Sequence, residues 1–369
     1  MKLSFPYMGE ATVAYQKLAN LLGHELIAPT KPTQKTIEMG VRYAPEFACF
    51  PLKVLLGTYL EAIEQGAEVI ISSGGNGPCR AGYYGEVHKK ILNSLGYDTR
   101  IIILDSINGD PRGILNDMKY LKGNNSWLDV WHSLKMVYRA IGMVDDIDRR
   151  LATIRPYEIT HGYCDKVWEK SLSLIDNAND LPALKRADQT IDEMILSVKK
   201  YLPDEKKQLK IGIIGEIYVV MESSVNMQIE KTLASLGCET RRSQYLSDWV
   251  DYHLLPHFIS KPHELYVREL GNEYFPLPIG GHARENMGWI KQFKEWDYDG
   301  IIHLLPFGCL PELMSQSIIP SVSHQLDIPV ISFPLDEQTG LANSITRLEA
   351  FIDLIKAKKQ GFARIKKVV

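Results

Sequence analysis

The sequence predicts an α/β protein with two related parallel-sheet domains and a helical insertion between them. Short apolar runs alternate with helical patterns over the first 120 residues. Strand signals are missing from Trp127 to about Lys207, and the alternation returns at Lys210 with KIGIIGE. We therefore expect an α/β domain at 1–120, a helical domain at 121–207 and a second α/β domain at 208–369.

The elements of the first domain alternate between strand and helix. Residues 2–8 and 24–29 read as strands, separated by a helix from about Glu10 to Leu22 that Gly23 ends. The elements expected after them are a helix from about Pro51, a strand at 68–73, a helix at 83–95 and a strand at 100–105. Because parallel strands need a crossover connection, this alternation predicts a parallel sheet.

The second α/β domain repeats the plan of the first. IISSGGNGPCR at 70–80 and IIHLLPFGCLPE at 301–312 each join an apolar strand, a bend rich in Gly and Pro, a cysteine and a helical pattern. In this alignment Gly281-His282 falls roughly where Ala48-Cys49 falls in the first half. An internal repeat of two Rossmann-like domains explains the pattern.

The composition is that of an ordinary globular protein. The 369 residues are 45% hydrophobic and 24% charged, and the formal net charge of -3 gives no sign of a nucleic-acid surface. We find neither an apolar run long enough for a membrane span nor a signal peptide, so we expect a cytoplasmic protein without a membrane partner. Five cysteines without close pairing argue for reduced thiols or metal ligands.

Three cysteines are the candidate metal ligands. Cys49, Cys79 and Cys309 lie beside Gly or Pro at predicted loop-to-helix junctions, where the helix dipole favours the thiolate. We expect them to face a cleft between the two domains and to hold one centre together, as an iron-sulfur cluster whose remaining iron is open or bound by another ligand. The alternative is that they are small buried hydrophobic residues, the role that we assign to Cys164 and Cys238.

Three further residues are candidates for acid–base chemistry. His282 lies on a glycine loop before a helix, which suits a ligand or a general acid or base, although it could be a solvated loop histidine. Glu10 and Glu216 follow glycines at the first strand end of each half, where a carboxylate could line the cleft. They could equally be acids of a first helical turn that favour the helix dipole.

The motifs APEFACFPLKV, GGNGPCRAGYYGEV, IGGHARENMG and HLLPFGCLPELMSQSIIP, with LDEQTGLANSITRLEAFIDL, resemble the 2-hydroxyacyl-CoA dehydratase superfamily. The most similar branch is usually named CoA-protein activase or acyl-CoA dehydratase-activase-related protein. The resemblance covers nearly the whole chain and is weakest through the helical insertion. It implies two related α/β domains that hold an iron-sulfur centre between them.

The resemblance also implies the ligands and the cofactor. Cys49, Cys79 and Cys309 match the motif cysteines, with Asn76, Gly77 and Gly308 in the loops beside the cluster. The family motif often reads GGCGPCR, and this chain has Asn76 in place of the extra cysteine. That departure favours a [4Fe-4S] cluster over the eight-iron double cubane of a related branch. The fourth iron would be open or bound by His282, Asn76, water or substrate.

Partners and activity follow from the same resemblance. In this superfamily a separate ATP-hydrolysing activator with an actin-like fold reduces the cluster, and two subunits pair as a homodimer or a heterodimer. We expect anaerobic, low-potential electron transfer to a substrate by a reductase or a dehydratase-like lyase. The alternatives are a non-catalytic electron carrier or cluster scaffold, a double-cubane reductase of small molecules, and a metal-free α/β binding module.

Overall fold

A computed structural model gives the structure of the chain and describes residues 1–74, 79–104, 111–201, 208–257, 261–277 and 279–365. Contacts divide the chain into two compact units. Unit 1 consists of Met1–Asp146, Glu169–Glu193 and Ile279–Gly281, and unit 2 consists of Ile147–Trp168, Met194–Pro278 and His282–Val369. The helices expected as an insertion are therefore shared between the two units.

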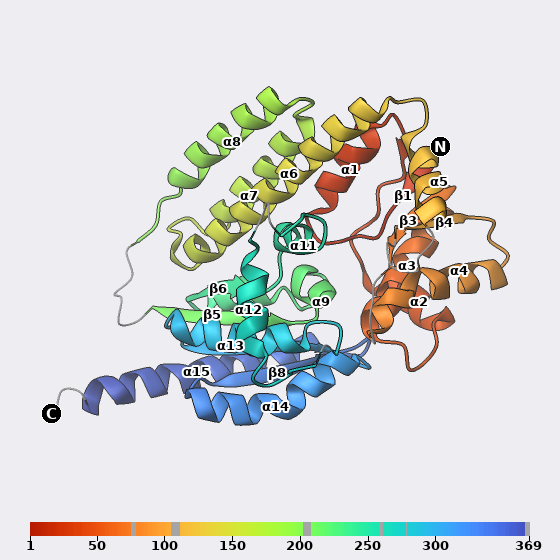
Figure 1. Cartoon of the computed structure of the whole chain (residues 1–369). Coiled ribbons are helices and arrows are strands. Elements are labelled where there is room, and N and C mark those ends of the chain that lie inside the picture. Colours follow the sequence, from red (N-terminus) through yellow and green to blue (C-terminus); the bar gives the residue numbers. More distant parts are fainter. Residues whose placement is uncertain (75–78, 105–110, 202–207, 258–260, 278, 366–369) are drawn as a thin grey trace. The chain divides into compact units, whose positions relative to one another are not determined.

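Each unit contains a four-stranded, all-parallel sheet flanked by helices (Figure 1), which confirms the predicted fold class. The sheet of unit 1 has the order β2-β1-β3-β4, with strands β1 (Lys2–Ser4), β2 (Glu25–Leu26), β3 (Val69–Ser73) and β4 (Arg100–Leu104). The sheet of unit 2 has the order β6-β5-β7-β8, with strands β5 (Leu209–Gly215), β6 (Cys238–Arg242), β7 (Gly300–Pro306) and β8 (Val330–Leu335). The two orders are the same, as an internal repeat requires.

The helices follow the predicted alternation. Those of the first α/β part are α1 (Thr12–Leu21), α2 (Gln34–Tyr43), α3 (Phe50–Glu64), α4 (Tyr84–Ser94) and α5 (Pro111–Lys122), with a 3-10 turn at Arg80–Tyr83. The shared helices are α6 (Trp127–Ile154), α7 (Tyr163–Asn177) and α8 (Leu181–Leu196). Those of the second α/β part are α9 (Ile217–Met221), α10 (Ile229–Ser235), α11 (Leu246–His253), α12 (His263–Gly271), α13 (Ala283–Glu295), α14 (Leu310–Leu326) and α15 (Leu341–Ile365). None of the helices in the described ranges is long and apolar enough to cross a membrane.

Two of the predicted strands are longer than the strands that form. The strand predicted at 2–8 ends at Ser4, and the strand predicted at 24–29 is reduced to Glu25–Leu26. Pro6 has no N–H with which to continue the ladder beyond Phe5, so β1 cannot extend toward residue 8. The edge strand β2 forms its hydrogen bonds with β1, and because β1 ends early, β2 is short as well.

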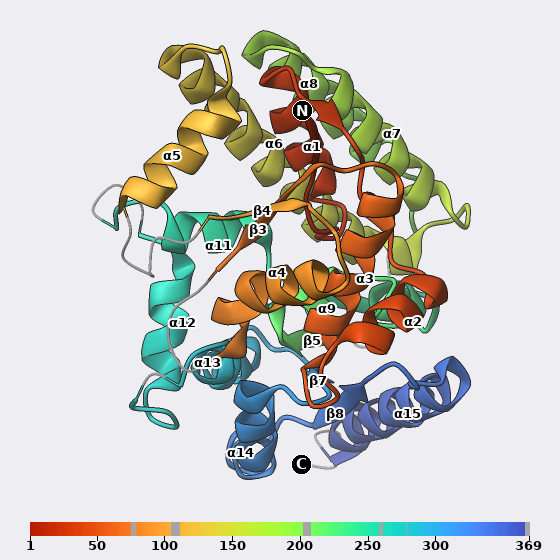
Figure 2. The ribbon, with the colours of Figure 1, turned by 90° about the vertical axis from the view of Figure 1, so that its right-hand side faces the viewer.

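In unit 1 helices cover both faces of the sheet. Ile70 and Ile101 pack with side chains of α3 and α4, whereas Val69 and Ile102 pack with α1 and α5. Neighbouring residues of a strand point to opposite faces, so these two clusters lie on opposite sides of the sheet. Figure 2 shows α4 on one side of β3 and β4 and α1 on the other. This is the three-layer arrangement of a doubly wound fold.

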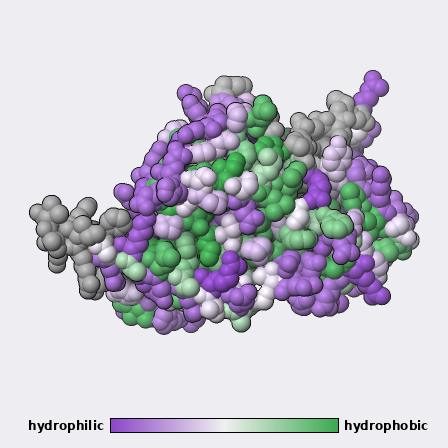
Figure 3. Space-filling view, turned by 90° about the horizontal axis from the view of Figure 1, so that it is seen from below, coloured by the Kyte–Doolittle hydropathy of each residue, from purple (hydrophilic) through white to green (hydrophobic). Residues whose placement is uncertain are grey.

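Unit 2 is built in the same way, and two strand glycines show how closely its helices approach. A Cβ on Gly212 of β5 would lie 2.5 Å from the ring of Phe293 on α13. One on Gly300 of β7 would lie 2.4 Å from Ile355 on α15. Gly212 pairs with Ile301, the neighbour of Gly300, so α13 and α15 cover opposite faces. On the face of the protein shown in Figure 3, apolar side chains reach the surface among polar ones.

Candidate functional site

The topology of each sheet marks one edge for ligand binding. From β1 the chain adds β2 on one side and then β3 on the other, and β5, β6 and β7 follow the same course. Where the winding direction reverses, the connections diverge beyond the carboxyl ends of the two middle strands and leave a crevice that binds ligands in α/β proteins. In unit 1 Glu10 follows β1 and Cys79 follows β3, and in unit 2 Glu216 follows β5 and Cys309 follows β7. Four of the predicted site residues thus stand at these two switch points.

The two cysteines of unit 1 lie on segments that are tied together. Cys49 is the N-cap residue of α3 and is buried, and Cys79 precedes the 3-10 turn that leads into α4. Arg80 Nη1 donates a hydrogen bond to the carbonyl oxygen of Phe47 at 2.8 Å. The Oη atom of Tyr84 lies 2.6 Å from Sγ of Cys49. These contacts hold the two cysteine-bearing segments next to each other, whereas Asn76 and Gly77 fall outside the described residues.

Exposed apolar side chains flank the cysteines in both units. Phe47 is 79% exposed and Tyr83 is 60% exposed in unit 1. In unit 2 Phe307, Leu310 and Leu313 are each about half exposed. Large apolar residues at the surface mark binding sites when they gather around polar or reactive groups. In both units the exposed apolar side chains near the cysteines are therefore suited to contact with another protein or a ligand.

In unit 2 three predicted residues stand at the starts of three helices. Glu216 is the N-cap of α9 and accepts a hydrogen bond from the Val219 amide at 3.1 Å. His282 is the N-cap of α13, and Cys309 is the N-cap of α14. Gly308 has a φ of 74°, a conformation that favours glycine, so the bend before Cys309 depends on this residue. Each position presents its side chain where backbone amides converge.

The helix pairs of the two units refine the predicted alignment. A Cβ on Gly57 would lie 1.9 Å from the Thr36 carbonyl oxygen, and one on Gly288 would lie 1.9 Å from that of Val267. These glycines and their partners Gly40 and Gly271 are separated by the same distance along the chain, 40 to 57 and 271 to 288. A Cβ on Gly40 or on Gly271 would also meet a carbonyl oxygen of the facing helix. The α2–α3 pair therefore repeats as α12–α13.

This register moves the counterpart of Cys49 by two residues. Counting from Gly40 to Cys49 and by the same step from Gly271 leads to Gly280 rather than His282. Gly280 and Gly281 have φ values of 78° and 58°, so the second half has a left-handed glycine turn at this point. Cys49 and His282 share the role of N-cap residue but not the same position in the repeat.

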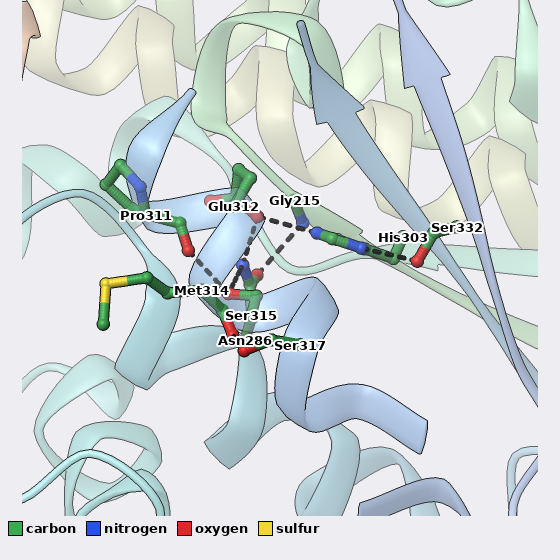
Figure 4. Close-up of polar contacts among 9 residues, drawn as sticks. All are labelled: Gly215, Asn286, His303, Pro311, Glu312, Met314, Ser315, Ser317 and Ser332. Atoms are coloured by element: carbon green, nitrogen blue, oxygen red, sulfur yellow. Dashed lines mark hydrogen bonds and ion pairs between the residues drawn. The ribbon is translucent and has the colours of Figure 1, made fainter. Parts of the chain in front are cut away.

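A buried polar network occupies the interior of unit 2 behind these helix starts (Figure 4). Oε2 of Glu312, on the first turn of α14, lies 2.8 Å from Nε2 of His303 and accepts a hydrogen bond from Nδ2 of Asn286 at 2.7 Å. Asn286 Oδ1 accepts from the Gly215 amide at 3.0 Å, and His303 Nδ1 lies 2.9 Å from Oγ of Ser332. Asn286, His303 and Glu312 are fully buried. The network connects three strands with α13 and α14.

The electrostatics of this region raise the pKa of one acid and lower that of a histidine. The pKa of Glu216 is raised to about 7, mainly by burial and to a smaller extent by the carboxylate of Glu312, while two backbone hydrogen bonds act to lower it. Burial lowers the pKa of His282 to about 4, although Glu312 favours its charged form. A carboxyl group that titrates near neutral pH is able to give and take protons.

Sequence reasoning missed Asn286, His303 and Glu312. The signal that was available is His303, a lone polar residue within the apolar run IIHLL, because a histidine on a buried strand needs a polar partner. Glu312 follows a proline at the start of a helix and resembles an ordinary first-turn acid. The chain alone does not show that the two side chains meet.

The remaining candidates have different surroundings. Glu10 is near Lys31, with Oε1 and Nζ 3.6 Å apart, at a partly exposed position. Cys164 and Cys238 are fully buried, and burial raises the pKa of each thiol to about 12, so both stay protonated and inert. Within the described residues of either unit, no three side chains of His, Cys, Asp or Glu form a group that could hold a metal.

No family model matches the chain, and no curated protein is significantly similar to it.

Proposed function

We propose that the chain is an iron-sulfur protein of the 2-hydroxyacyl-CoA dehydratase type, in which Cys49, Cys79 and Cys309 together ligate one [4Fe-4S] cluster. The observation that carries the proposal is that all three cysteines stand directly before a helix, two of them at the switch points of two sheets with the same strand order. Neither unit has all three, so cluster binding requires cysteines from both. When bound, such a cluster supplies single electrons at low potential.

The residues around the cysteines support this donor set. Helix N-termini stabilise thiolates, which are the form that binds iron. The Tyr84 hydroxyl is placed to donate a hydrogen bond to the Cys49 sulfur, and the Arg80 contact fixes the loop that carries Cys79. Hydrogen bonds to ligand sulfurs and an apolar border are the features that tune the potential of a cluster.

A separate ATP-hydrolysing activator with an actin-like fold would supply the electrons, and a second subunit, identical or related, would pair with this one. Both partners come from the family resemblance. The polar network of unit 2 favours an enzyme over a pure electron carrier, because reduction or dehydration of an organic substrate moves protons as well as electrons. A metal-free binding module is the second candidate, since this network needs no metal for its own hydrogen bonds.

The test is iron and sulfide content on protein purified without oxygen, with an EPR spectrum after reduction. We expect about four irons per chain, the content of a single cubane cluster. Cys49→Ala, Cys79→Ala and Cys309→Ala should each lose the cluster. The matched control is Cys164→Ala, because this thiol is buried in the core and should leave the iron content unchanged.

Each outcome decides between the candidates. Equal iron in all four variants would refute the ligand assignment. About eight irons per chain in the wild type would indicate a double cubane in spite of Asn76. No iron, even after reconstitution with iron and sulfide, would leave the metal-free binding module.

A further inference from the structure

The buried network of unit 2 connects the two carboxyl groups of the candidate site. Asn286 accepts a hydrogen bond from the Gly215 amide at Oδ1 and donates one from Nδ2 to Oε2 of Glu312 (Figure 4). The Asn286 side chain therefore connects Glu312 to the backbone that carries Glu216. The Glu216 amide is also directed at the Leu304 carbonyl oxygen, 3.4 Å away, next to His303. The bend after β5 and the first turn of α14 are therefore held in one arrangement.

The bend after β5 requires a glycine at position 215. Gly215 has a φ of 143°, and a Cβ at this position would lie 2.2 Å from the Leu304 carbonyl oxygen. Only glycine fits there, and the fit keeps Glu216 close to β7. A backbone that requires glycine beside a fully buried polar network is costly for stability, and such costs concentrate at functional sites.

Glu312 has unused capacity within this network. Its Oε2 atom takes the contacts with Asn286 and His303, while Oε1 is buried and has no hydrogen-bond partner among the described residues. A buried carboxylate oxygen that accepts no hydrogen bond lowers the stability of the folded protein, and a proton donor close to it reduces this loss. Among the described residues, Asn286 from α13 and His303 from β7 contact Glu312, which also acts electrostatically on His282 at the start of α13 and on Glu216.

We propose that Glu216 and Glu312 form a two-carboxylate acid–base unit at the switch point of unit 2. Glu312 is the buried anchor, held by His303 and Asn286, and Glu216 is the group that exchanges a proton with a bound ligand. Glu216 follows the carboxyl end of β5 and keeps part of its surface exposed to solvent, although the surrounding protein raises the pKa of its carboxyl group. The inference rests on the proposed function only for the identity of the ligand that receives the proton.

The proton balance of this unit is simple. The O–H bond of the Glu216 carboxyl group breaks when its proton passes to a basic atom of the ligand, and the remaining negative charge stays on Glu216. Solvent returns the proton afterwards. An electron for a reductive step would come from the low-potential donor of the proposed function, so Glu216 changes only its protonation.

The test follows the titration of Glu216 by carbon-13 NMR of labelled glutamate carboxyl groups in metal-free protein, with the signal assigned by its loss in Glu216→Gln. Glu312→Gln removes the neighbouring negative charge and should shift the Glu216 midpoint down, though not to its ordinary value, because burial remains. Asn286→Asp adds a negative charge and should shift the midpoint up. The double variant Asn286→Asp with Glu312→Gln exchanges acid and amide and should bring the midpoint back toward the wild type.

The opposite signs separate this role from structural damage, because a loosened site would shift the midpoint in one direction only. The control is Glu264→Gln, which removes a carboxyl group whose pKa burial raises to about 8 and which interacts with Glu285 rather than Glu216. It should leave the Glu216 titration unchanged. Circular dichroism confirms that each variant is folded.

An unchanged Glu216 midpoint in Glu312→Gln, or shifts of the same sign in both single variants, would overturn the proposal. Because the NMR experiment uses metal-free protein, its result does not depend on the iron assay. Protein without iron that shows the expected shifts would refute the proposed cluster and retain the acid–base unit. Protein with four irons per chain whose Glu216 midpoint does not shift in the variants would support the proposed cluster and refute the acid–base unit.

Discussion

Buried histidines of this chain are held in two different ways. His303 has a polar partner on each ring nitrogen, Glu312 on one side and Ser332 on the other. His88 in unit 1 donates from Nε2 to the Leu52 carbonyl oxygen at 3.0 Å, and its Nδ1 atom has no partner among the described residues. A histidine in the second situation is stable only as the neutral form, because a proton on Nδ1 would find no acceptor.

This difference predicts an acid-sensitive contribution from His88. Burial lowers its pKa from 6.5 to about 4, so the unfolded chain binds a proton on this residue before the folded chain does. Stability is therefore full above pH 6.5 and falls as the pH drops toward 4, by about 3 kcal/mol for this group. We expect His88→Gln, which keeps a donor for Leu52, to flatten the loss of stability in urea unfolding between these pH values.

The control for this prediction is His132→Gln, which changes an exposed histidine and should leave the pH dependence of stability as it is. The same slope in wild type and His88→Gln would show that other groups are responsible for the acid sensitivity. The result concerns stability alone and is independent of any cofactor.

At the scale of elements, the most demanding contacts are the two helix pairs α2–α3 and α12–α13. In each pair a glycine of one helix faces a carbonyl oxygen of the other, so the two backbones touch. The packing explains why both halves have glycines at these helical positions although glycine is unfavourable in a helix interior. It also fixes the start of α3 near Cys49 and the start of α13 near His282.

Gly57→Ala should separate α2 from α3, because its Cβ would lie 1.9 Å from the Thr36 carbonyl oxygen. We expect a loss of roughly 3 kcal/mol or more in the free energy of unfolding, the upper range for overpacking. The matched control is Gly142→Ala within α6, where no atom lies within 4 Å of the new Cβ. That variant should gain about 0.5–1 kcal/mol. Equal effects of the two alanines in thermal unfolding would contradict this account of the helix contact.

For the whole molecule, the division into two units is the main structural fact. Each unit has its own parallel sheet, its own helix layers and its own close-packed helix pair. The repeats have also diverged in chemistry. Unit 1 places a tyrosine beside a buried cysteine, and unit 2 places a glutamate, a histidine and an asparagine in the equivalent layer.

Units with separate cores should respond separately to damage. We expect Gly57→Ala to increase hydrogen exchange mainly in unit 1 and Gly288→Ala to increase it mainly in unit 2, measured by mass spectrometry of peptides from β3 and β7. The reason is that each substitution disrupts packing within one core. If either variant increased exchange equally in both sheets, the chain would behave as a single cooperative unit instead.

The sequence by itself determined the fold class, the internal repeat and the position of Cys79 and Cys309 after strands β3 and β7. These features depend on local patterns: apolar runs of strand length, helical periodicity, and glycine or proline at the bends. The bend at Cys309 is an example, because Gly308 has the positive φ that its residue type allows. The absence of strand signals after Trp127 likewise agrees with the helices α6, α7 and α8.

The tertiary structure decided what these patterns could not. Asn286, His303 and Glu312 lie on three different elements, and only the packing of α13 and α14 against β7 brings their side chains within hydrogen-bond distance. The two-residue shift between His282 and the counterpart of Cys49 likewise became visible through glycine contacts between helices. Local periodicity fixes which face of an element is buried, whereas the partner that a buried polar group meets depends on long-range packing, which leaves no regular spacing in the chain.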